Sequence, residues 1–214
     1  MRIESALAAI LSDKTRIGQV LIQRVNNGGF SVCHRDEENG ADLEIFRNPE
    51  DAIEIARYDD LGSYRPLKTA PNLRRGWQLQ VVDLGELRRA LDYFYPGRLA
   101  ALRAWTENAL TTTALRDTLD RQSGMYRIAA KISDEQIDAV VGNVCRSDGG
   151  CLRTILWKRD KMGAVPSMKL PAEKFNPAHD QTGRGESAIP LLCQEACAVL
   201  VNECRKAVKN ETTE

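Results

Sequence analysis

Hydrophobic and polar positions alternate in short runs over the first part of the chain. These runs predict a helix over residues 2–11 and strands over residues 18–25, 30–34 and 43–46. Asn26-Asn27-Gly28-Gly29 separates the first two strands, and Asn and Gly readily adopt the positive φ that tight hairpins need. The pattern therefore predicts a small α/β unit built around a hairpin.

A predicted helix and a loop complete this N-terminal module. Asn48 is placed at the N-cap and Pro49 at the first position of a helix that extends to about Arg57. Residues 59–75 have no clear period and contain one Gly and two Pro, which is typical of a structured loop or linker. We therefore predict an N-terminal α/β module over residues 1–75.

The hydrophobic period changes from that of strands to that of helices after residues 77–82, which form one more strand pattern. Three helices are predicted from their start signals: Asp83 through Phe94, Pro96 through about Leu110, and Thr113 as the cap of residues 114–121. Their buried stripe includes Leu87, Leu91, Leu99, Leu102 and Trp105.

The C-terminal part is predicted to be mainly helical. Ser133-Asp134-Glu135-Gln136 is a capping box for a helix that leads to Cys145. Residues 152–157 form a short apolar run that fits a strand or a helix, and residues 162–187 are loop-like. A final helix is predicted from about Cys193 to Val208. The expected fold class is α+β, with residues 76–214 forming a helical region and the C-terminal domain.

Composition and charge exclude several classes of protein. Hydrophobic residues make up 43% of the chain and charged residues 28%, as in ordinary globular proteins. Thirty basic residues balance thirty acidic ones, so no nucleic-acid partner is predicted. No apolar run reaches the roughly 18 residues of a membrane-spanning helix, and no signal peptide is recognised. We expect a cytoplasmic protein, in which six cysteines do not form a disulfide framework and a cluster of them binds metal or takes part in catalysis.

Four of the cysteines form two pairs, Cys145-x5-Cys151 and Cys193-x3-Cys197. In the predicted final helix the second pair would share one face and lie in the first turn, where free N–H groups and the helix dipole favour anionic sulfur. Cys151 follows two glycines, so backbone amides can approach the sulfides of a cluster. The spacing favours an iron–sulfur cluster over a zinc site, whose pairs are usually C-x2-C, but leaves zinc open.

The other cysteines and the histidines are given simpler interpretations. Cys33 lies in the hairpin, and Cys204 shares a helical face with Val201 and Val208, so both are predicted to be core residues. His34 and His179 are isolated in the sequence and form no ligand pair.

Three C-terminal segments resemble the [4Fe–4S] cluster-binding domain family associated with CbiX-type sirohydrochlorin chelatases. They are residues 121–126 (Arg-Gln-Ser-Gly-Met-Tyr), the run from Cys145 to Trp157, and the run from Ile189 to Cys197. The segments 64–68, 70–73 and 76–77 resemble the stabilising module that precedes that domain. The resemblance implies that the ligands of a [4Fe–4S] cluster are Cys145, Cys151, Cys193 and Cys197, with [2Fe–2S] or zinc less favoured.

The resemblance does not extend to the chelatase domain, which binds its metal and tetrapyrrole through histidines. Two scattered histidines do not supply such a site, so chelatase activity is not implied for this chain alone. The pattern Cys-x5-Cys, long gap, Cys-x3-Cys also resembles the ligand pattern of sirohaem-containing sulfite and nitrite reductases, which favours [4Fe–4S] over [2Fe–2S].

Three functions remain open at this stage. The first is electron transfer or redox sensing linked to sirohaem or cobalamin metabolism, with a redox partner or a chelatase protein. The second is a structural four-cysteine module, with zinc or a cluster, that serves protein interaction. The third is a redox enzyme in which Arg121, Tyr126 and Trp157 line a substrate site, although such aromatics more often pack around a cluster. Catalytic residues stay unassigned.

Overall fold

The computed structural model describes residues 3–26, 28–38, 40, 42–58, 73–123, 127–145, 154–163, 165–166 and 187–210. Contacts divide these residues into two compact units. We call them the sheet unit, which comprises the described residues up to 108 together with 187–191, and the helical unit, which comprises the described residues of 109–166 together with 192–210. Each unit is described by itself.

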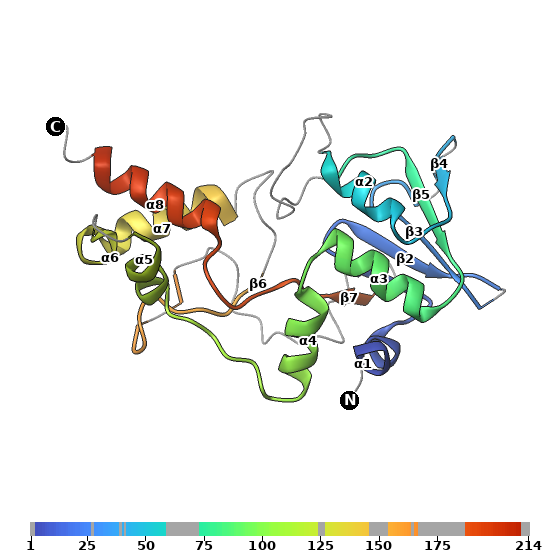
Figure 1. The fold of residues 1–214 in the computed structure, drawn as a ribbon, viewed down its shortest axis with the longest axis horizontal. Helices are drawn as coiled ribbons and strands as arrows, with labels where there is room; N and C mark the ends of the chain where they lie inside the picture. The colour runs from blue at the N-terminus through green and yellow to red at the C-terminus, as the bar shows by residue number, and fades with distance from the viewer. Residues whose placement is uncertain are drawn as a thin grey trace. The chain divides into compact units, whose positions relative to one another are not determined.

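Six described strands form the mixed sheet of the sheet unit, in the spatial order β4-β5-β3-β2-β1-β7 (Figure 1). The four central strands are antiparallel to one another, whereas β4 and β7 at the two edges run parallel to their neighbours. The bounds are β1 (Lys14–Ile17), β2 (Val20–Arg24), β3 (Phe30–His34), β4 (Glu44–Phe46), β5 (Trp77–Val81) and β7 (Ser187–Ile189).

The predicted strands of the N-terminal module are confirmed. β2 and β3 pair from Val20 opposite His34 to Arg24 opposite Phe30, and Gly28 in the connection has a φ of +86°, as the turn signal indicated. β1 was not predicted, because its four residues carry little hydrophobic signal: Lys14 and Arg16 alternate with Thr15 and Ile17.

Four described helices pack with this sheet: α1 (Ile3–Ile10), α2 (Asp51–Arg57), α3 (Leu84–Phe94) and α4 (Arg98–Thr106). The start of α3 is as predicted, because the Asp83 carboxylate accepts a hydrogen bond from the Glu86 backbone N–H at 2.8 Å. α4 is shorter than predicted at both ends, and Gly97 at its N-cap position has a φ of +72°.

The predicted start of α2 is wrong by two residues. The sequence placed Asn48 at the N-cap and Pro49 in the first turn, whereas Glu50 occupies the N-cap position. The backbone N–H groups of residues 51–53 bond to carbonyl oxygens three residues earlier, which is the pattern of a tight 3₁₀ turn. Asn48 and Pro49 therefore lie in the turn that precedes the helix.

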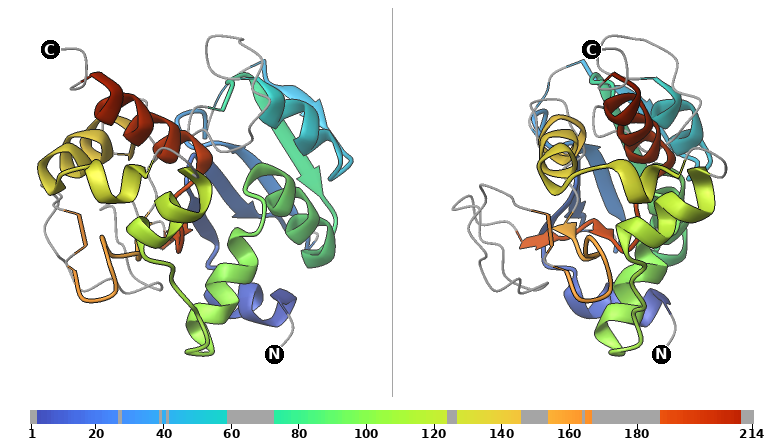
Figure 2. Two further views of the ribbon diagram at one scale, coloured as in Figure 1. Left: turned by 60° about the vertical axis from the view of Figure 1, so that its left-hand side comes forward. Right: turned by 90° about the vertical axis from the view of Figure 1, so that its left-hand side faces the viewer.

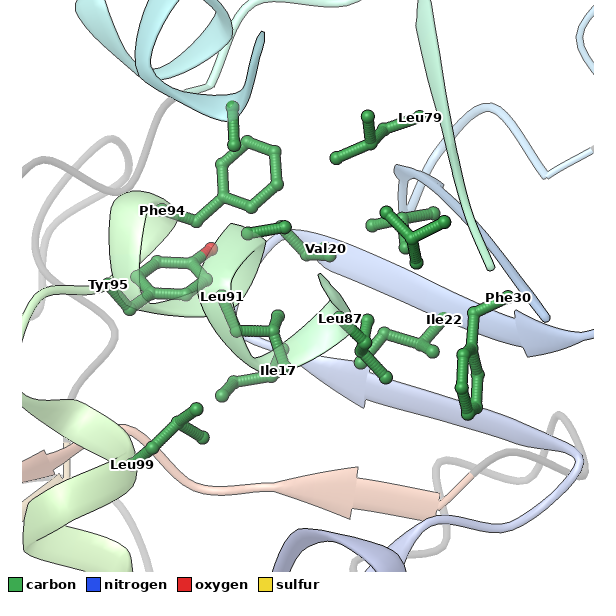
Figure 3. Packing of buried hydrophobic residues seen from close by; sticks show 14 of the residues in the cluster. Ile17, Val20, Ile22, Phe30, Leu79, Leu87, Leu91, Phe94, Tyr95 and Leu99 are labelled. Atoms are coloured by element: carbon green, nitrogen blue, oxygen red, sulfur yellow. The ribbon is translucent and has the colours of Figure 1, made fainter. Parts of the chain in front are cut away.

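The core of the sheet unit is formed by the sheet together with buried side chains of α1, α2, α3 and α4. Leu87, Leu91 and Phe94 of α3 point toward the apolar side chains of β2 and β5 (Figure 3). The rings of Trp77 and Phe94 stack with their centroids 5.1 Å apart. Of the stripe predicted for the middle of the chain, Leu87, Leu91, Leu99 and Leu102 are buried, whereas Trp105 is only partly buried.

The helical unit contains α5 (Leu115–Ser123), α6 (Ile128–Lys131), α7 (Asp134–Cys145) and α8 (Ala198–Asn210), with the short parallel strands β6 (Thr154–Ile155) and β8 (Leu192–Cys193). α7 and α8 lie side by side (Figure 2). The core takes side chains from the four helices and β6: Leu115, Leu119, Ile128, Ile137, Val141, Ile155, Leu200, Val201 and Val208.

Arg116 ties the helices of this unit together. Its guanidinium donates to the carbonyl oxygens of Ala129 and Ile132 at the end of α6, at 2.6 and 3.2 Å, and to the Asp134 carboxylate at the start of α7, at 2.7 Å. Charge-assisted bonds of this kind satisfy helix-end carbonyls that lack an intrahelical partner.

The predicted α+β class is confirmed, with a mixed sheet and helices in the N-terminal part and a mainly helical C-terminal part. The units divide elsewhere than the predicted boundary after residue 75. β5 lies between β4 and β3, so residues 77–108 are grouped with the sheet unit. Most of the predicted loop over residues 162–187 falls outside the described residues. None of the helices described here is long and apolar enough to cross a membrane.

Candidate metal centre

Cys145 is positioned by α7, of which it is the last residue. The predicted capping box starts this helix: the Gln136 backbone N–H donates to Ser133 Oγ at 3.2 Å, and the Ser133 backbone N–H donates to Gln136 Oε1 at 2.8 Å. Ile137 and Val141 are buried on the helix face that contacts the core. The same face leads to Cys145, which is partly buried against that core.

Cys145 and Cys197 lie at the same end of the α7–α8 pair. Gln136 Nε2, in the first turn of α7, donates to the Ala207 carbonyl oxygen near the end of α8, at 3.5 Å. The two helices are therefore antiparallel, so the end of α7 lies beside the start of α8. Cys197 directly precedes α8.

The predicted placement of Cys193 and Cys197 on one helical face is wrong. Cys193 lies in β8, opposite Ile155 of β6, and its carbonyl oxygen accepts the Leu156 backbone N–H at 2.9 Å. α8 begins only at Ala198. Leu192 and Cys193 are held in the extended conformation by pairing with β6, which outweighs the helical spacing of Cys193 and Cys197.

Cys197 nevertheless keeps the electrostatic advantage of a helix start. Its carbonyl oxygen accepts the Val201 backbone N–H at 3.1 Å, which is the first hydrogen bond of α8 and marks Cys197 as the N-cap residue. The free N–H groups and the positive end of the α8 dipole favour negative charge on a sulfur at this position. Cys193 in its strand lacks this contribution.

The Cys193 thiol has polar partners on two sides. Trp157 Nε1 donates a hydrogen bond to Cys193 Sγ at 3.3 Å, and Sγ in turn donates to the Glu195 carbonyl oxygen at 3.3 Å. The Glu195 carboxylate is paired with Arg121 of α5 at 2.9 Å. The loop between the two cysteines is thus held against α5 and β6. A metal ion at Cys193 would replace the thiol proton, since the thiolate is the ligand.

The chemistry of these donors fits an iron–sulfur cluster, which is held by thiolates. Cys145, Cys193 and Cys197 are each partly buried at the rim of one core. Cys151, the fourth predicted ligand, lies outside the described residues, as do Tyr126 and His179. Within the described part of the chain, no three His, Cys, Asp or Glu side chains are close enough together to hold a metal ion. The assignment of the four ligands stays a prediction.

Comparison with known families decides what this part of the chain is. Residues 107–206 match the family described as 4Fe–4S iron–sulfur cluster binding domain. This segment is a 4Fe–4S cluster binding domain. Residues 4–109 match the DR2241 stabilising domain, so the two matches together span most of the chain. The resemblance found in the sequence is confirmed, and the matched domain implies a [4Fe–4S] cluster as the cofactor.

A solved structure is similar over nearly the whole chain. It is the crystal structure of DR2241 from Deinococcus radiodurans, described as a multi-domain protein with structural similarity to chelatases and two additional novel domains. The TM-score is 0.73 and the sequence identity 28%, over 97% of this chain. The chain spans only 41% of DR2241. A search of curated proteins gave no significant match.

The two remaining cysteines are core residues, as predicted. Cys33 in β3 is 3% exposed and Cys204 in α8 is fully buried. Burial raises the pKa of Cys33 to about 11 and that of Cys204 to about 12, so both stay protonated at neutral pH. His34 is buried in β3, and burial lowers its pKa. These side chains are not among the candidate ligands of the 4Fe–4S domain.

Two contacts of the 4Fe–4S domain were missed by sequence reasoning. Arg121 and Trp157 were considered as residues lining a substrate site, but in the structure Arg121 pairs with Glu195 and Trp157 donates to a cysteine sulfur. Neither contact has a local sequence signal, because the partners are 74 and 36 residues apart.

Proposed function

We propose that Cys145, Cys151, Cys193 and Cys197 hold a [4Fe–4S] cluster that transfers electrons in tetrapyrrole metabolism, that of sirohaem or cobalamin. The observation that carries the first half is the position of three half-buried cysteines at the rim of one core, inside a 4Fe–4S cluster binding domain. When bound, the cluster supplies a site that accepts and releases one electron.

The chain's own residues have distinct tasks in this proposal. Cys197 contributes a sulfur at the start of α8, where the helix dipole offsets the negative charge of the cluster. Cys145 contributes a sulfur from the end of α7, beside that helix start. Trp157, which is fully buried, excludes water from one side of Cys193. A site that is half-buried in this way keeps solvent from the metal and leaves one side accessible to an electron donor or acceptor.

The tetrapyrrole link and the partner rest on the similarity to DR2241. That protein resembles chelatases, and the present chain spans 41% of it. We propose that a chelatase-like protein or domain works with this chain, and that the cluster exchanges electrons with it or with its bound tetrapyrrole. The proposed compartment is the cytoplasm, where thiols remain reduced and free to bind iron.

The test is anaerobic reconstitution of the full chain with iron and sulfide. We expect a coloured protein with equal iron and sulfide contents and an EPR signal that appears on reduction. Adding a chelatase with its tetrapyrrole should then accelerate reoxidation of the reduced cluster. Colourless protein after reconstitution would refute the cluster. A reduced cluster whose reoxidation rate is unchanged by the chelatase and its tetrapyrrole would refute only the tetrapyrrole link.

One observation also favours a structural role for the metal. Cys145, Cys193 and Cys197 pack against the same core that joins α7 to α8, so a bound cluster or zinc ion would cross-link these elements. In that case Cys145→Ser would lower the melting temperature of the chain, and the bound metal would show no redox couple in the range of biological reductants. A reversible one-electron couple would favour electron transfer instead.

A further inference from the structure

The indole of Trp157 is aimed at one of the predicted cluster ligands. Trp157 follows β6 and is 0% exposed. β6 pairs with β8, which carries Cys193, and the Leu156 backbone N–H donates to the Cys193 carbonyl oxygen at 2.9 Å. The pairing of β6 with β8 therefore places the indole beside the sulfur. Trp157 Nε1 donates a hydrogen bond to Cys193 Sγ at 3.3 Å.

In this hydrogen bond the indole is the donor and the sulfur is the acceptor. An indole N–H is a donor only, and when it is buried it needs an acceptor. For Trp157 the acceptor that the structure provides is Cys193 Sγ. A thiolate that ligates iron is a stronger acceptor than a thiol, because it carries negative charge.

We propose that the Trp157 N–H sets the reduction potential of the cluster through its hydrogen bond to Cys193 Sγ. This inference rests on the proposed function. On reduction one electron from a low-potential reductant enters the cluster, no protein bond breaks and no proton is transferred. The added charge is shared by the ligand sulfurs, so the N–H donor stabilises the reduced form more than the oxidised form. The hydrogen bond thus raises the potential.

If Trp157 acted only through packing, a variant that keeps its shape and lacks the N–H donor would leave the reduction potential unchanged. Trp157 belongs to the core of the helical unit, so replacing it with Phe changes both the packing and the hydrogen bond. Its replacement by 3-benzothienylalanine, in which sulfur takes the place of the indole N–H, keeps the shape of the side chain and removes only the donor. The two variants together separate the hydrogen bond from the packing.

The experiment is a redox titration of the reconstituted full chain, followed by EPR. The benzothienyl variant is expected to show an approximately tenfold lower equilibrium constant for reduction, which is about 59 mV for one electron. Trp157→Phe should shift in the same direction. Trp105→Phe in α4 of the sheet unit is the matched control and should leave the potential unchanged.

A second readout is the iron–thiolate stretching frequency in the resonance Raman spectrum. Loss of the hydrogen bond leaves more electron density for the Fe–S bond to Cys193, so this frequency should rise in the benzothienyl variant. Equal potentials and frequencies in that variant and the wild type would overturn the inference and leave the cluster itself intact. Failure of the wild-type chain to form any cluster would instead refute the proposed function.

Discussion

The sheet unit closes its core with paired strands and helices. In the helical unit the strands among the described residues are two residues long, and three half-buried cysteines lie at the rim of the core. The thiols of the two units differ accordingly. Cys33 in the sheet unit is buried, and its pKa is raised to about 11 by burial, so it behaves as a small apolar side chain. Cys193 in the helical unit instead has an N–H donor on its sulfur. A thiol buried in apolar surroundings stays protonated and unreactive, whereas a partly exposed thiol with polar partners can lose its proton and bind metal.

The largest effect is expected from replacing the rim cysteines. Cys145→Ser, Cys193→Ser and Cys197→Ser should each lower the iron and sulfide content by at least about tenfold, because the cluster is held by four thiolates. Cys33→Ala and Cys204→Ala are the matched controls and should keep the full content, since both thiols are buried in cores. Loss of iron and sulfide in either control would show that the buried thiols also contribute to cluster binding, against the difference drawn between the two sets of cysteines.

Next come substitutions in the two cores. Leu91→Ala in α3 and Leu200→Ala in α8 each remove a buried side chain and should each cost about 2–5 kcal/mol of unfolding free energy. Only Leu200→Ala should also speed the release of iron to a chelator, because Leu200 lies three residues after Cys197 in the helical core. Denaturant unfolding with local hydrogen exchange measures the first effect, and equal iron release by both variants would contradict the second.

A smaller effect is expected above pH 9 from Cys33. Its folded-state pKa of about 11 lies above the unfolded value of 9.0, so the unfolded chain loses the thiol proton first. The stability that this group contributes is complete below pH 9 and falls by roughly 1 kcal/mol per pH unit between pH 9 and 11. In urea unfolding from pH 8 to 10, Cys33→Ala should lose less stability than the wild type. Parallel pH profiles would show that Cys33 ionises normally.

The smallest effects are expected at the helix starts, one in each unit. Asp83→Ala removes the cap of α3 and Ser133→Ala removes the cap of α7, each at a cost of about 1 kcal/mol. Ser133→Thr keeps the hydroxyl and should stay close to the wild type. Unfolding free energies measured in urea test this, and an unchanged value for Ser133→Ala would mean that the capping box does not position α7.

The starts of α3 and α7 and the two hairpin strands were predictable because their signals are local. Asp83 and the Ser133–Gln136 box bond to backbone groups within three residues, and β2 and β3 flank an Asn-Gly turn. β1 is too short and polar to show a period, and although it pairs with the adjacent β2, its second partner β7 lies more than 150 residues further along the chain. Such pairing is decided by contacts that no local pattern encodes.

The candidate centre was predictable in its residue types and not in its local structure. The spacing of Cys193 and Cys197 fits a helix, but β8 pairs with β6 and places Cys193 in a strand. Cys197 was expected in the first turn of the final helix, and it lies directly before α8. The donor from Trp157 depends on that strand pairing, which is why it emerged only from the structure.

The position of β7 also bears on how the chain folds during its synthesis. This edge strand of the sheet is encoded after α7, and only Pro190 and Leu191 separate it from β8. A ribosome therefore releases β1 to β5 and the helix carrying Cys145 long before the sheet receives its last strand. Until then β1 presents an unpaired edge, which is a site for wrong association. The last strand of the sheet and the two cysteines Cys193 and Cys197 are then synthesised within a few residues of one another.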